Sequence, residues 1–197
     1  MMIPKKYLKD YKVAETYDEN GEAMAKVIYI AGEYAFEPPV TDSGKKKIVA
    51  LAAAGMTAIF ISLFLISPTG IAREVHIMIP HVLSVISMLV TTFTALALLR
   101  SEATMMRVDA EKVTKRLSPF ALISAILNVA AITGVVISAV GSPDSFLFSD
   151  AVFVGLMLIM AASCATIFAL FHKVKPKKVA ESMNNAKLKG KGKAKKS

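Results

Sequence analysis

Several ionisable side chains near the ends of the second and fourth apolar runs are of the types that bind divalent metals. His76 and His81 supply imidazole nitrogens, and Glu74, Asp144 and Asp150 supply carboxylates. The spacing of the histidines argues against a shared site, because five residues of helix turn through about 140°. Asp150 is already explained as a helix cap. His76, His81 and Asp150 therefore remain weak metal candidates, and we expect them to be interfacial polar groups.

Other arrangements that carry catalysis are not apparent in the sequence. There is no nucleophile beside a base, no glycine-rich phosphate loop and no pair of catalytic carboxylates. The single cysteine, Cys164, excludes an internal disulfide and a multi-cysteine metal site. His172 is most simply a cation at a helix C-terminus. The sequence predicts a protein that is not an enzyme and needs no cofactor.

The elements that would position these residues are four long apolar runs. The chain has 197 residues, 54% of them hydrophobic, and its charged residues are separated from the runs. About 20 apolar residues match the roughly 30 Å hydrocarbon core of a bilayer. We therefore predict an all-α membrane protein, with a bundle of four transmembrane helices within residues 48–171 and spans at about 48–67, 80–99, 119–140 and 151–171.

The helix starts are predicted from capping residues and prolines. The second helix is best begun at Pro80, because the first turn tolerates the missing N–H, although a start near Val75 with a bend at Pro80 stays open. Ser118 followed by Pro119 predicts the start of the third helix, and Asp150 precedes the fourth. Residues 100–116 are expected to continue the neighbouring helices.

The cations predict the orientation in the plasma membrane. The segments before the first run, between the second and third, and after the fourth hold 23 of the 24 Lys and Arg, and the other two loops hold only Arg73. Lys and Arg accumulate on the cytoplasmic side of a membrane. Both termini are therefore predicted to be cytoplasmic, and residues 68–79 and 141–150 to face outward.

Residues 1–47 are predicted to form a cytoplasmic cap that contains a short β-hairpin. Asn20-Gly21 is a strong signal for a two-residue hairpin turn. This turn would place Val13 opposite Ile28, with apolar residues facing apolar residues. Because a lone two-stranded ribbon is marginally stable in water, the cap is a candidate site for contact with a protein partner.

Residues 172–197 are predicted to form a disordered basic tail. The tail holds ten lysines and almost no apolar residues, so burial cannot offset the entropy of ordering. Its charge favours contact with anionic lipid of the inner leaflet. Nucleic acid is the disfavoured alternative, because no aromatic or arginine residues are interleaved.

The apolar runs contain no Asp, Glu, Lys or Arg. Coupled transporters and small multidrug exporters depend on such residues, so we exclude these classes for the chain acting alone. Small residues recur every four positions, and Asn128 is expected to hydrogen-bond between helices. Residues spaced in this way form a stripe of small side chains along each helix. The simpler interpretation is that the stripes pack against one another within one bundle. The alternative is that one stripe contacts a second subunit of a homo-oligomer. The predicted packing residues are Ala50, Ala54, Ala58, Ser62, Ser87, Thr91, Ala95, Asn128, Ala130, Gly134, Ser138, Ala161, Ala165 and Ala169.

Three classes of function remain, in order of preference. The first is a non-enzymatic accessory, scaffold or regulatory membrane subunit that acts through protein and lipid contacts. The second is an oligomeric transport or pore component with a hydroxyl-lined passage for a small neutral solute. The last is a membrane enzyme that uses the outer His and Asp residues.

Overall fold

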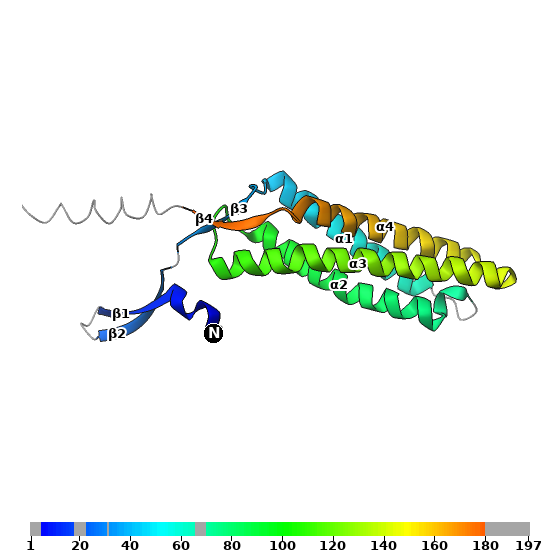
Figure 1. Ribbon diagram of the computed structural model, residues 1–197, viewed down its shortest axis with the longest axis horizontal. Helices are drawn as coiled ribbons and strands as arrows, with labels where there is room; N and C mark the ends of the chain where they lie inside the picture. Colours follow the sequence, from blue (N-terminus) through cyan, green and yellow to red (C-terminus); the bar gives the residue numbers. More distant parts are fainter. Residues whose placement is uncertain (1–4, 18–22, 31, 66–69, 180–197) are drawn as a thin grey trace, which may run out of the picture. The chain divides into compact units, whose positions relative to one another are not determined.

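The computed structural model describes residues 5–17, 23–30, 32–65 and 70–179. These residues are mostly helical, and four of the helices are long and apolar enough to cross a membrane. The long helices are α1 (Asp42–Leu65), α2 (Val75–Arg100), α3 (Arg107–Gly141) and α4 (Phe148–Phe171), shown in Figure 1. Two short 3₁₀ helices, η2 (Ile71–Arg73) and η3 (Pro143–Ser145), precede α2 and α4.

The chain divides into two compact units. The first unit comprises Met1–Phe36, Glu102–Glu111 and Pro176–Ser197, and the second comprises Glu37–Ser101 and Lys112–Lys175. Within the described part of the first unit, η1 (Lys5–Asp10) leads into strands β1 (Tyr11–Tyr17) and β2 (Ala23–Tyr29). A second two-stranded sheet joins β3 (Tyr34–Glu37) to β4 (Lys175–Lys178).

All four long helices begin earlier than the preferred predictions. Helix α1 begins at Asp42 rather than near residue 48, and α4 begins at Phe148, so that Asp150 lies in its first turn rather than before it. Helix α2 begins at Val75 and contains Pro80, which is the alternative that the sequence left open. Helix α3 begins at Arg107 and continues through Ser118 and Pro119, so the predicted start there is wrong. A Ser-Pro pair favours a helix start only when nothing upstream is helical. Here about three helical turns already precede it, and the first of them is closed by N–H bonds from Asp109 and Ala110 to Met106 O.

The predicted hairpin register is also wrong, by one residue. Val13 pairs with Val27 rather than Ile28, and Tyr11 pairs with Tyr29. The two tyrosine rings meet edge to face with centroids 5.1 Å apart, a contact that stabilises this register. A shift of one residue exchanges the faces of a strand. The predicted turn at Asn20-Gly21 lies outside the described residues.

The predicted disorder of the tail does not extend to its first residues. Lys175–Lys178 form β4, which pairs with β3, and Val179 N–H donates to Glu33 O at 2.8 Å. The sequence signal failed here because strand pairing depends on a partner far along the chain, not on the apolar content of the tail. Residues 180–197 lie outside the described part.

The four-helix bundle has an apolar surface and a partly polar interior. Large apolar side chains are exposed on every long helix; among the most exposed are Phe64 (89%), Phe93 (68%), Val140 (77%) and Phe148 (85%). Conversely, Ser62, His81, Ser84, Ser124 and Asn128 are completely buried. A protein folded in water shows the opposite tendency, because burial of apolar surface is its main driving force.

Candidate functional site

A chain of buried polar side chains in the helical bundle is the first candidate site. It begins at His81, whose Nε2 lies 3.3 Å from the hydroxyl of Ser62 on α1 and whose ring meets Phe153 of α4 edge to face. Ser62 donates its own hydrogen to Ile59 O at 2.7 Å. His81 Nε2 must therefore be the N–H donor, which makes Nδ1 an acceptor in the neutral ring. Within the described part of the chain, Nδ1 has no hydrogen-bond partner.

This row of buried polar side chains continues from α2 to α3 through Ser84 and Asn128. Ser84 donates to His81 O at 2.6 Å and lies 3.4 Å from Asn128 Oδ1. Asn128 Nδ2 donates to Ser124 O at 2.7 Å, and the Ser124 hydroxyl reaches Ser84 O at 3.4 Å. The contacts of Asn128 with α2 are those expected of an interhelical amide, since an unpartnered amide in this interior would be unfavourable.

Toward the other end of α2 the polar groups bond within their own helix. Thr91 donates to Ser87 O at 2.9 Å and Thr94 donates to Val90 O at 2.7 Å. The thiol of Cys164 lies 3.4 Å from Met88 Sδ, in a sulfur contact between α4 and α2. These contacts satisfy Thr91 and Thr94 within α2, and the sulfur contact joins α2 to α4, whereas the buried Thr92 hydroxyl has no hydrogen-bond partner among the described residues.

The sequence interpretation placed His81 at the outer surface and therefore missed its place in this chain. Because α2 begins at Val75 rather than Pro80, His81 lies in the second helical turn and points into the bundle. A signal was present in the spacing. His81, Ser84, Ser87, Thr91 and Thr94 recur every three or four residues, which places them on one helix face.

The other weak metal candidates lie in separate environments. The Asp150 carboxylate accepts N–H bonds from Leu147, Ile71 and Ala72, at 2.9, 3.3 and 3.0 Å. It thus caps α4 and also fastens η2 to the start of α4. Across the described ranges, no group of three or more His, Cys, Asp or Glu residues is placed to hold a metal ion.

His76 lies in a small exposed cluster with Glu74 and Ser138. Ser138 donates its hydroxyl hydrogen to Glu74 Oε2 at 2.6 Å, and His76 Nε2 lies 3.1 Å from Ser138 Oγ. The hydrogen of Ser138 points toward the carboxylate, so His76 does not act as its base. The arrangement differs from a catalytic triad, in which the carboxylate contacts the far nitrogen of the histidine.

The predicted packing residues are divided between the interior and the surface. Ala58, Ser62, Ser87, Thr91, Ala95, Asn128 and Gly134 are buried, Ser138 and Ala161 are half-buried, and Ala50, Ala54, Ala130, Ala165 and Ala169 are exposed. A Cβ at Gly134 would lie 2.9 Å from Ile77 Cγ1, so α3 approaches α2 closely at this glycine. Ala161 and Ala165 of α4 line a shallow apolar hollow of about 450 Å³ beside α3.

The first unit contains a second polar cluster, centred on Arg107. Arg107 Nη1 lies 3.5 Å from Asp10 Oδ1, and its Nε donates to Glu111 Oε1 at 2.8 Å. The backbone N–H of Arg107 donates to the Tyr29 hydroxyl at 2.9 Å. Partial burial raises the pKa of Tyr29, although this hydrogen bond acts in the opposite direction. The cluster joins three segments that are distant in sequence.

Comparison with known proteins gives no relative for this chain: no family model, no curated protein and no solved structure matches it.

Proposed function

We propose that this chain is an integral membrane protein of the plasma membrane, a non-enzymatic accessory, scaffold or regulatory subunit that acts through its cytoplasmic unit. The observation that supports membrane insertion most strongly is the reversed distribution of polarity. Large apolar side chains cover the bundle, whereas serine, histidine and asparagine lie inside it. In lipid such an arrangement is favourable, because the hydrocarbon solvates the apolar surface, and most of the buried polar groups are hydrogen-bonded within a helix or between helices.

The two ends of the bundle support the predicted orientation. Lys45, near the start of α1, donates to Ser101 O just after α2 at 2.7 Å, so two cation-rich segments adjoin. Asp150 joins η2 to the start of α4 at the cation-poor loops. Cation-rich loops belong on the cytoplasmic side, which also places the termini there.

The first unit supports a role in contacting a protein partner. Its Arg107 cluster joins residues that precede α1 in the sequence, Asp10 and Tyr29, to the segment that follows α2. Leu8, Ile30 and Met106 of this unit are nevertheless exposed, with 54%, 44% and 47% of their surface accessible. These side chains would be available for burial against a partner.

Co-purification tests this role. In mild detergent, the tagged full-length chain should retain one stoichiometric protein partner, identified by mass spectrometry. The double variant Leu8→Ser/Ile30→Ser should lose that partner while the bundle stays folded. Phe146→Ser, which changes an exposed apolar residue just after η3, is the matched control and should retain it.

A preparation that contains only copies of this chain would contradict the accessory role. The buried polar chain from Ser62 to Asn128 would then favour the second candidate, an oligomeric transport component for a small neutral solute.

A further inference from the structure

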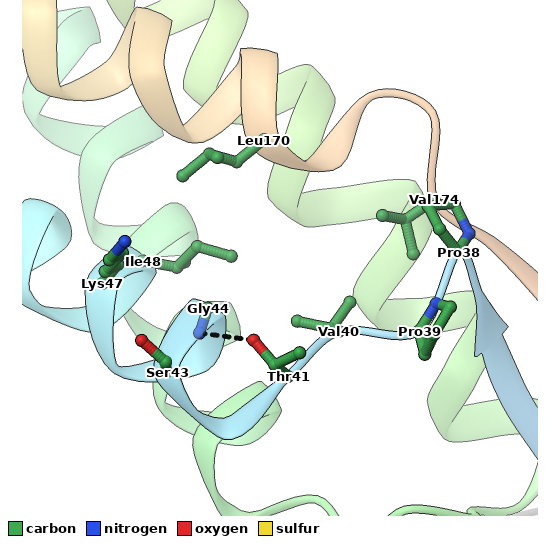
Figure 2. Close-up of a pocket in the computed structure, with 10 residues that line it drawn as sticks. All are labelled: Pro38, Pro39, Val40, Thr41, Ser43, Gly44, Lys47, Ile48, Leu170 and Val174. Atoms are coloured by element: carbon green, nitrogen blue, oxygen red, sulfur yellow. Dashed lines mark hydrogen bonds between the residues drawn. The ribbon is translucent and has the colours of Figure 1, made fainter.

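A cavity of about 230 Å³ lies within the second unit, where the start of α1 meets the end of α4 (Figure 2). In this view Lys47 and Ser43 lie on one side of the cavity, Pro38 and Val174 lie on the other, and Leu170 of α4 lies above. The full lining is Pro38, Pro39, Val40, Thr41, Ser43, Gly44, Lys47, Ile48, Leu170 and Val174. The cavity therefore combines one polar, cationic side with an apolar wall.

The polar side can bind an anion. The Thr41 hydroxyl accepts the Gly44 N–H at 3.1 Å, and Lys45 N–H donates to Thr41 O at 2.9 Å. Ser43, which lines the cavity, therefore has its N–H in the first turn, outside the helix ladder. The helix dipole adds positive potential there. The Asp42 carboxylate does not line the cavity, since it is 91% exposed and lies 3.7 Å from Lys45 Nζ.

A second, more open hollow of about 440 Å³ continues from this cavity along α1. It shares Ser43 and Lys47 with the cavity and adds Lys46 and Ala50. Lys46 and Lys47 are both exposed. Ala50, one turn after Lys46 and Lys47, is exposed as well, so the hollow ends on the apolar surface of α1.

We propose that this site binds one anionic phospholipid from the cytoplasmic leaflet. Lys46, Lys47 and the start of α1 hold the phosphate, while the glycerol backbone rests on Val40, Ile48 and Leu170. One acyl chain leaves the hollow beside Ala50 and enters the hydrocarbon. The combination of cations, free backbone donors and an adjoining apolar wall fits an amphiphile better than a soluble phosphate. This inference rests on the proposed membrane insertion and adds a defined lipid site to it.

The test measures bound lipid on the purified full-length chain. The protein is equilibrated in mixed micelles that contain phosphatidylglycerol and phosphatidylcholine, and retained lipid is counted by native mass spectrometry. We expect one phosphatidylglycerol molecule per chain. Lys46→Gln/Lys47→Gln should lower its affinity about tenfold, from the loss of two near-surface cations. Lys112→Gln/Lys115→Gln, which removes the same charge from α3, should leave it unchanged.

Two further arms separate the lipid from other anions. Leu170→Gln keeps the cations but disrupts the apolar wall, and it should weaken phosphatidylglycerol binding. Excess inorganic phosphate should not displace the lipid. Three results would each overturn the proposal. The protein could retain phosphatidylcholine as well as phosphatidylglycerol, the two double lysine variants could lose the same affinity for phosphatidylglycerol, or inorganic phosphate could displace the lipid fully.

Alkaline extraction of membranes distinguishes failure of the site from failure of the proposed function. If the wild-type chain stays in the membrane pellet but shows no lipid preference, only the lipid site is wrong. If the chain is extracted, membrane insertion itself is wrong and the lipid site fails with it.

Discussion

Replacing Asp150 by alanine should lower the free energy of unfolding by about 3–5 kcal/mol, the largest effect that we expect from a single substitution. The carboxylate is 1% exposed and accepts N–H bonds from Leu147, Ile71 and Ala72. Its removal leaves these donors buried without an acceptor and separates η2 from the start of α4. The absence of a side chain at Gly70 leaves room for the carboxylate, since a Cβ there would lie 2.8 Å from Asp150 Oδ1.

Thermal or denaturant unfolding in detergent micelles measures this effect. Asp150→Asn should cost less than Asp150→Ala, because the amide oxygen still accepts. Asp144→Ala removes an exposed carboxylate from η3, six residues earlier, and is expected to change stability by less than about 0.5 kcal/mol. If Asp150→Ala lowers the free energy of unfolding no more than Asp144→Ala does, the Asp150 carboxylate does not hold η2 to the start of α4.

Arg107→Ala should destabilise the first unit by about 2 kcal/mol and expose it to protease, while the helical bundle stays folded. Asp10 is 4% exposed, and within the described residues its Oδ2 has no hydrogen-bond partner, so Arg107 is the cation that balances it. Breaking a buried pair from one side costs about 3–5 kcal/mol. The expected loss is smaller here because Arg107 is 27% exposed and the separation is 3.5 Å.

Limited proteolysis of membranes, with the rate of cleavage within residues 1–36 as the readout, tests this prediction. The double variant Arg107→Ala/Asp10→Ala should recover part of the resistance, because no unpaired buried charge remains. Lys9→Ala changes an exposed neighbour and serves as the control. If the single and double variants are cleaved at the same rate, the pair does not hold the unit together.

The long helices were predictable because each is a run of apolar residues whose length and composition are local properties. The structure has long apolar helices at all four predicted places. Their starts were less predictable, as Pro80 and the Ser118-Pro119 pair show. Proline is well suited to the first turn of a new helix, and it is also a costly but tolerated residue within a longer one.

The features that depend on distant segments could not be read from the sequence. Two of them, the pairing of β4 with β3 and the ion pair of Arg107 with Asp10, join residues far apart in the sequence. The register of the hairpin is a choice between two local pairings of nearly equal stability that differ by one residue. The buried polar chain was partly predictable. Asn128 was expected to contact another helix, whereas His81 was assigned to the surface because its helix was started too late.

The central claim is that four helices cross the membrane and that both ends of the chain are cytoplasmic. Single-cysteine labelling of intact cells tests it, in a Cys164→Ala background. Ser145→Cys, in η3, should react with a membrane-impermeant maleimide in intact cells, because Ser145 is exposed at the proposed outer end. Lys173→Cys, just after α4, should react only after lysis. Labelling of Lys173→Cys but not Ser145→Cys in intact cells would contradict the account.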